Sequence, residues 1–268
     1  MREHKLSIKP STVQKMNQVD VVLDEGALNG ETCFPSACAV VLGDAAKAKE
    51  QVELGIRQLM LKPEFRLEPS ATKFRDEGFH HVSDNLLARN HFLSLLPKVD
   101  YEWVCATNLT VGSDDPYEML PSQFLWVTTR ILEKYKGNRV NLVFEQNQRL
   151  NNQFQAIVEA AAEVAGVPMP NVTVSIEGKE NRVLAIADYC IALSSQAIGE
   201  WRKKCCKEHD LSSSYQYRNF AGVELRCSSL FAIDLRKGLS SRSSRLNDKS
   251  YYEVAGQHNE NCSSFQGK

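Results

Sequence analysis

Short apolar runs alternate with helical stripes along most of the chain. Runs rich in β-branched residues predict strands, whereas apolar residues spaced three or four apart predict helices. The first two runs flank an Asn-Gly pair that is typical of a turn, so we expect them to form a hairpin. The predicted strands cover residues 19–23, 37–42, 101–107, 140–144 and 172–176.

Helical patterns occupy the segments between these strands. Proline or glycine follows several of them, as is typical of helix ends. Strands that alternate with helices in this way predict an α/β fold, a mixed sheet with helices on its faces. The predicted helices cover residues 45–61, 83–96, 115–135, 151–165 and 182–201.

The same pattern divides the chain into four parts. A polar N-terminal extension, residues 1–18, precedes one α/β domain, residues 19–204. Residues 205–238 form a C-terminal extension in which two short apolar stretches could pair as a hairpin. Residues 239–268 are rich in Ser, Arg and Asn, which predicts a disordered basic tail.

Composition limits the class of protein. Hydrophobic residues make up 43% of the 268 residues, enough for a sizeable core. No apolar run approaches the ~20 residues that span a bilayer, and the N-terminus lacks the apolar region of a secretion signal. The eight cysteines are scattered without a CxxC pair, so neither a zinc site nor a disulfide framework is indicated. We therefore expect a reduced cytoplasmic protein with no membrane segment.

The net charge of −1 hides an asymmetry. Residues 201–268 hold 12 basic and 7 acidic side chains, a net charge of +5, which leaves −6 for the rest of the chain. An acidic body with a basic arm suits a carboxylate site plus an arm that contacts phosphates, through residues such as Arg242, Arg245 and Lys249. An ordinary solvated tail would have the same composition.

Two adjacent acids, Asp24 and Glu25, end the first predicted strand. A pair of acids at the end of a buried strand is costly unless a cation or water neutralises it. If the strand continues, Glu25 points to the opposite side of the sheet from Asp24. The alternative is a solvated turn, since Asp and Gly are turn formers.

Two further acids lie in similar surroundings. Glu145 directly ends the fourth predicted strand, and parallel strands place their C-terminal ends at the same edge of a sheet, where ligands bind. Asp188 is the only charge between Val183 and Ser194, on the last predicted helix. A carboxylate among so many apolar groups needs a cation or several donors. Alternatively, Asp188 caps a loop or pairs with an arginine.

These motifs resemble a bacterial family of unknown function with an RNase H-like fold. That family opens with a strand ending in Asp-Glu-Ser-Gly, has a middle strand ending in Asp or Glu, and has a late helix reading roughly Leu-Gln-Leu-Ala-Asp. The matching stretches here are 23–26, 143–145 and 184–188, and the resemblance covers roughly residues 19–200. The chain departs from the family in lacking the Ser and the Gln.

The resemblance implies a metal-dependent nuclease. Asp24, Glu145 and Asp188 would hold two Mg²⁺ or Mn²⁺ ions, which activate water and neutralise the leaving oxygen. Glu25 would support them or join them if the turn redirects it. A His-containing segment also recurs in the family, which implies that His81 holds the scissile phosphate or shuttles a proton. Histidines 80 and 81 could equally be ordinary loop residues.

Three functions remain open from the sequence. The first is a nuclease acting on DNA or RNA, such as a defence or mobile-element protein. The second is a non-catalytic RNase H-like module that binds nucleic acid or a partner protein, or forms a homo-oligomer. The third is a phosphatase or nucleotidyl hydrolase on a similar sheet. Three carboxylates that converge within a few ångström would favour the first.

Overall fold

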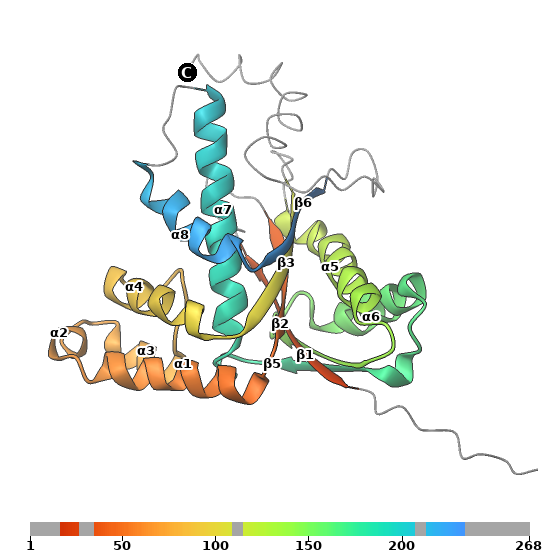
Figure 1. Ribbon diagram of the computed structural model, residues 1–268, viewed down its shortest axis with the longest axis horizontal. Coiled ribbons are helices and arrows are strands. Elements are labelled where there is room, and N and C mark those ends of the chain that lie inside the picture. The colour runs from red at the N-terminus through yellow and green to blue at the C-terminus, as the bar shows by residue number, and fades with distance from the viewer. Residues whose placement is uncertain (1–16, 27–34, 109–114, 207–212, 234–268) are drawn as a thin grey trace, which may run out of the picture.

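The computed structural model describes residues 17–26, 35–108, 115–206 and 213–233 (Figure 1). Its six strands form a single mixed sheet in the order β5-β4-β1-β2-β3-β6. Within these described ranges, no helix combines the length and apolar character that crossing a membrane requires. The strands are β1 (Gln18–Gly26), β2 (Ser36–Leu42), β3 (Tyr101–Asn108), β4 (Arg139–Glu145), β5 (Val172–Glu177) and β6 (Cys227–Ile233).

The strand directions identify the fold. β1, β2 and β3 form an antiparallel meander, while β4 pairs with β1 in parallel and β5 pairs with β4 in parallel. The first five strands thus have the order 3-2-1-4-5 with only β2 reversed, which is the arrangement of an RNase H-like sheet. The expected fold class, an RNase H-like α/β sheet flanked by helices, is confirmed.

Helices cover both faces of the sheet (Figure 1). α5 and α6 lie on one face, and α7 lies on the other, where α1 to α4 and α8 pack around it. Short 3-10 helices occur at Leu96–Lys98, Pro116–Glu118 and Met169–Asn171. The α-helices are α1 (Ala45–Met60), α2 (Pro63–Arg66), α3 (Ala71–Glu77), α4 (Leu86–Leu95), α5 (Leu120–Lys134), α6 (Asn151–Ala165), α7 (Leu184–Cys206) and α8 (Tyr215–Glu224).

Alternation along β1 fixes which side chains meet which helices. Val21 and Leu23 belong to the hydrophobic cluster under α5 and α6, whereas Val22 belongs to the cluster under α7. Since side chains alternate along a strand, Asp24 follows Val22 onto the α7 face. Gly26 lies on that face too, and a Cβ atom there would come within 2.7 Å of the Ile191 side chain. Glycine therefore lets α7 approach the end of β1.

The predicted elements within residues 19–201 are largely confirmed. All five strands and all five helices exist, with shifted ends in several cases. The second predicted helix begins at Leu86 rather than at residue 83, because the Asn85 side chain accepts a hydrogen bond from the Ala88 amide and caps it. Residues 63–82, which carry no clear pattern, contain α2 and α3.

The hairpin expected within residues 205–238 is wrong. Residues 222–224 end helix α8, and β6 pairs in parallel with β3 instead of folding back on its own neighbour. The apolar side chain of Phe220 packs against Trp103 and Trp201, so this segment is part of the core. Most of the N-terminal extension and the whole basic tail, residues 239–268, lie outside the described residues.

We expect Phe220→Ala to lower the free energy of unfolding of the whole domain by about 3–5 kcal/mol, because it removes a buried ring between two tryptophans. Arg218→Ala, an exposed change on the same helix, is the matched control. Urea unfolding followed by tryptophan fluorescence and circular dichroism would measure both. A Phe220→Ala protein with unchanged stability would show that α8 is a separate appendage.

Candidate functional site

The ends of β1 and β4 bring two acids together. Leu23 lies beside Phe144 at the end of the parallel pairing of β1 with β4, so the next residues, Asp24 and Glu145, lie side by side where this pairing ends. Val143 belongs to the cluster under α7, and alternation places Glu145 on the same face. The Asp24 carboxyl is buried and close enough to Glu145 for the charge of Glu145 to raise the pKa of Asp24. Two neighbouring carboxyl groups repel each other when both are charged, which favours the protonated form of one of them.

Asp188 is the third acid. It lies on α7, which packs across β1 and β2, and the residue is only 9% exposed. One carboxylate oxygen, Oδ2, accepts hydrogen bonds from His80 Nδ1 at 2.8 Å and from the His81 backbone amide at 2.7 Å. Asp188 therefore holds the loop before α4, one of the two roles left open by the sequence, while it also faces the other acids.

Two of the three acids, Asp24 and Glu145, have a raised affinity for protons. Burial raises the pKa of Asp24 well above its usual value, and the charges of Glu145, Glu25 and Asp188 raise it further. Burial and then the Asp188 charge raise the pKa of Glu145. No ion pair neutralises Asp24 or Glu145 within the part of the chain that the structure describes. The cluster thus has an excess of negative charge that a proton or a cation would relieve.

Oxygen donors of this kind suit a hard divalent cation such as Mg²⁺ or Mn²⁺. Among the described residues, however, no three His, Cys, Asp or Glu side chains are arranged to hold a metal ion. The three acids fit such an ion in the type of their donor atoms and in their charge. To bind it, their side chains would have to turn toward a common point. The metal site remains a prediction.

Glu25 lies on the other face, as expected for a strand that continues to Gly26. Its Oε1 accepts a hydrogen bond from the Asn147 side chain, and its Oε2 is buried without a hydrogen-bond partner among the described residues. Burial, opposed by the Asn147 hydrogen bond and aided by the Glu145 charge, raises the pKa of Glu25 to about 7. Glu25 supports the end of β1 rather than facing Asp188.

The two adjacent histidines have different positions. His81, the residue singled out in the sequence, is buried with its ring edge-on to Tyr189 at 5.1 Å between centroids. Burial lowers the pKa of His81 to about 4. His80 instead lines the pocket beside Asp188, whose hydrogen bond raises the pKa of His80. Which of two neighbouring side chains faces a site depends on the loop, which the sequence pattern does not specify.

Asp84 is a supporting residue that sequence reasoning missed. Its Oδ2 accepts hydrogen bonds from the His80 amide at 2.9 Å and from the Tyr189 hydroxyl at 2.6 Å. Arg89 Nε donates to the His81 carbonyl at 2.9 Å. Both ends of the two-histidine segment are thereby fixed, which holds the His80 ring against Asp188.

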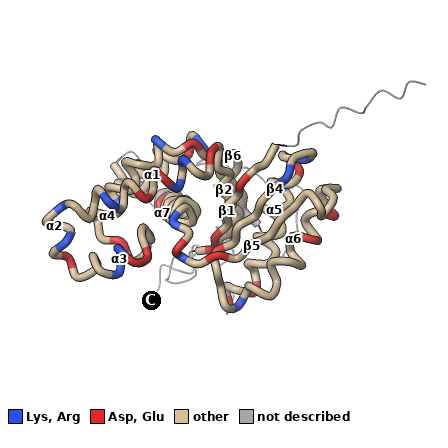
Figure 2. The backbone as a smooth tube through the Cα atoms, turned by 90° about the horizontal axis from the view of Figure 1, so that it is seen from below, with Lys and Arg blue, Asp and Glu red and all other residues tan. Residues whose placement is uncertain are grey.

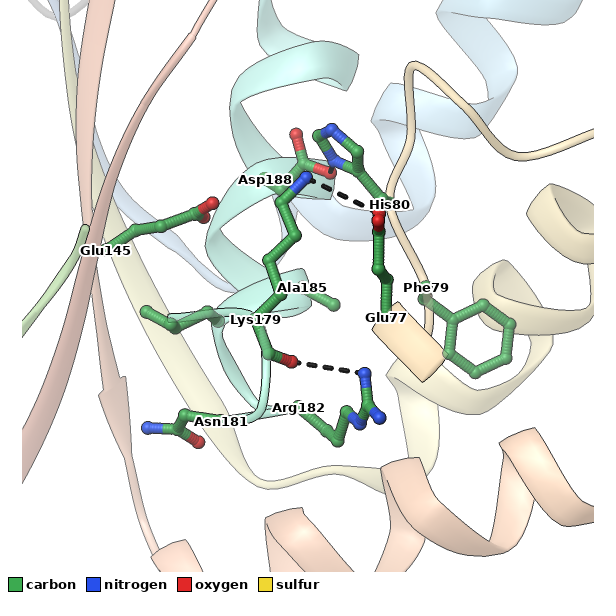
Figure 3. Close-up of a pocket in the computed structure, with 10 residues that line it drawn as sticks. Glu77, Phe79, His80, Glu145, Lys179, Asn181, Arg182, Ala185 and Asp188 are labelled. Carbon is green, nitrogen blue, oxygen red and sulfur yellow. Dashed lines mark hydrogen bonds and ion pairs between the residues drawn. The ribbon is translucent and has the colours of Figure 1, made fainter. Parts of the chain in front are cut away.

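These groups surround a small pocket (Figure 3). Glu145 lies on one side, Asp188 and the His80 ring that hydrogen-bonds it lie together on the other, and residues of α3 and of the turn before α7 form the mouth. The hollow is small and opens to solvent, so it has no room for a whole nucleotide.

Charges of both signs surround this region. Figure 2 shows Lys and Arg interspersed with Asp and Glu along α1 to α4 and near the end of β5. In that view no continuous basic stripe follows the described elements. Attraction of a polyanion would therefore depend on a few individual cations near the pocket.

Comparison with known proteins gives little guidance. No family model matches the chain, and no curated protein matches its sequence. Among solved structures, it is similar to a chain of the PCNA:RNase HII complex from Archaeoglobus fulgidus. The TM-score is 0.38 and the identity 10%, over 76% of this chain and 86% of that chain. A similarity this low carries no argument about activity, so function has to be argued from the residues.

We expect Glu25→Gln to flatten the pH dependence of stability. With a pKa of about 7 when folded and 4.5 as the reference value, Glu25 binds more protons in the folded state between these pH values. The free energy of unfolding therefore falls as pH rises through this window. Glutamine does not titrate, so Glu25→Gln removes the contribution of Glu25 to this fall, which is on the order of 1–3 kcal/mol between pH 5 and pH 8.

Urea unfolding in EDTA at both pH values measures this effect. Glu159→Gln, an exposed change on α6, is the control and should keep the pH dependence of the parent protein. Equal pH dependence in Glu25→Gln and the parent would contradict the assignment.

Proposed function

We propose that the protein is a nuclease that depends on Mg²⁺ or Mn²⁺ and hydrolyses phosphodiester bonds of DNA or RNA. The observation that carries the proposal is the convergence of Asp24, Glu145 and Asp188 from β1, β4 and α7. An acid cluster that only stabilised the fold would be expected to have cationic partners, because unpaired buried charges are destabilising.

In this proposal each acid has a part in holding the ions. Asp24 Oδ1 accepts a hydrogen bond from the Glu25 amide at 2.7 Å, which fixes the carboxyl near the end of β1. When bound, the ions would activate water and neutralise the leaving oxygen. His80 would hold a proton or a phosphate oxygen at the rim, and Asp188 orients its ring.

The family resemblance agrees with this assignment. The matched motifs fall at the ends of β1 and β4 and on the first turns of α7, the three places from which the acids converge. We extend the proposal to a bacterial defence or mobile-element protein that acts in the cytoplasm. Three of the described cysteines are free and buried, which suits a reducing compartment: Cys38, Cys105 and Cys190.

A non-catalytic module that binds nucleic acid or a partner protein is the second candidate. It is favoured by one observation: the described acids do not form a ready coordination shell. In that case Asp188 would serve chiefly to anchor the His80–His81 loop. Metal binding separates the two candidates, since the module needs none.

We expect Asp24→Asn and Asp188→Asn each to reduce Mn²⁺-dependent cleavage of labelled single- and double-stranded DNA and RNA by at least about 100-fold. In each variant the remaining amide oxygen can accept the hydrogen bonds that one carboxylate oxygen accepts in the parent, so the fold should survive. Without metal, Asp24→Asn should melt at the same temperature as the parent or higher, since it removes one charge from a repelling cluster.

Asp20→Asn is the matched control, because it makes the same change on the same strand outside the cluster. It should retain full cleavage. Titration of Mn²⁺ followed by electron paramagnetic resonance gives a second measurement, in which the two site variants lose binding and Asp20→Asn does not. Parent protein that neither binds Mn²⁺ nor cleaves any of the substrates would refute the nuclease proposal.

A further inference from the structure

At the mouth of the pocket, the Arg182 side chain connects the turn between β5 and α7 to α3 (Figure 3). Arg182 donates from Nη1 to the Lys179 carbonyl at 3.2 Å and from Nη2 to the Asp76 carbonyl. Its Cδ atom lies only 3.0 Å from the position of a Cβ atom at Gly78, which has φ of +78°. The Arg182 guanidinium is thus occupied in holding two backbone segments together.

Lys179 is held much more loosely. Its Nζ lies 3.9 Å from Glu77 Oε2, and Glu77 also pairs with Lys73 at 3.6 Å. The side chains of Lys179 and Glu77 are 39% and 36% exposed. An ion pair this long and this exposed contributes little to stability, so Lys179 can exchange Glu77 for another anion at low cost.

The Lys179 side chain also faces the acids. It lines the pocket together with Glu145, Asp188 and His80 (Figure 3). Its charge lowers the pKa of both Glu145 and His80, so the ammonium is close to both groups. Lys179 and Arg182 are the only Lys or Arg residues among those that line the described pocket. Of these two cations, Lys179 is the one that can move.

We propose that Lys179 binds a phosphate oxygen of the nucleic-acid substrate at the mouth of the pocket, releasing Glu77 as it does so. A phosphodiester that approaches three carboxyl groups is repelled unless a cation faces its other oxygens. A flexible ammonium is a point charge that can follow such a group. This inference rests on the proposed function for its substrate class, but it concerns binding and can be measured without cleavage.

The test uses the full chain and a short fluorescein-labelled single-stranded oligonucleotide, whose binding is followed by fluorescence anisotropy in EDTA and in Ca²⁺ over a range of salt. Lys179→Gln should weaken binding roughly tenfold and reduce the slope of log affinity against log salt by about one. Lys179→Arg, which keeps the charge, should restore most of the affinity. Binding of Mn²⁺ should not weaken in Lys179→Gln.

Lys73→Gln is the matched control, because Lys73 also pairs with Glu77 but does not line this pocket. It should keep affinity within about twofold and leave the salt slope unchanged. Equal effects of Lys73→Gln and Lys179→Gln would overturn the assignment. If the parent protein binds the oligonucleotide through Lys179 but cleaves no substrate, the nuclease proposal alone is refuted. If the parent cleaves and Lys179→Gln leaves both binding and cleavage unchanged, this inference alone is refuted.

Discussion

The parallel pairing of β1 with β4 is the constraint on which the rest of the site depends. It places Asp24 and Glu145 side by side where the pairing of these two strands ends, and α7 closes over them because Gly26 lets Ile191 approach. Both strands are held by apolar clusters on either face, so the acids cannot separate without disturbing the core. Packing therefore enforces a contact between like charges that electrostatics alone would oppose.

Alternation along the strands explains how much could be predicted. Burial of Val21, Val22 and Leu23 leaves one orientation for Asp24 and the opposite one for Glu25, and the structure has both. The helices were predictable because their apolar stripes are long. By contrast, the apolar stretches of α8 and β6 are short, and the pairing of β6 with β3 depends on tertiary contacts that no local pattern encodes.

The loop before α4 shows a feature that local sequence patterns do not determine, namely the orientation of its side chains. Two histidines follow each other, and the local sequence pattern does not determine which of them faces the site. The choice is made by Asp84, which accepts the His80 amide and the Tyr189 hydroxyl, and by Asp188, which accepts the His81 amide. Asp188 and Tyr189 lie on α7, and Asp84 lies four residues after His80 in the chain. The orientation of His80 is therefore a product of the assembled fold.

The same network bears on whether the acids serve structure or ligand binding. Asp188 accepts both of its hydrogen bonds from the loop through one oxygen, Oδ2, so these bonds do not occupy its second oxygen. Asp24 likewise accepts the Glu25 amide through Oδ1 alone. A carboxylate has room for about four hydrogen bonds, so these two keep unused acceptor capacity. Neither carboxylate has an oxygen among the buried, unpartnered side-chain atoms of the described residues, so each serves the fold. The acceptor positions that remain are those through which the proposed cation would be held.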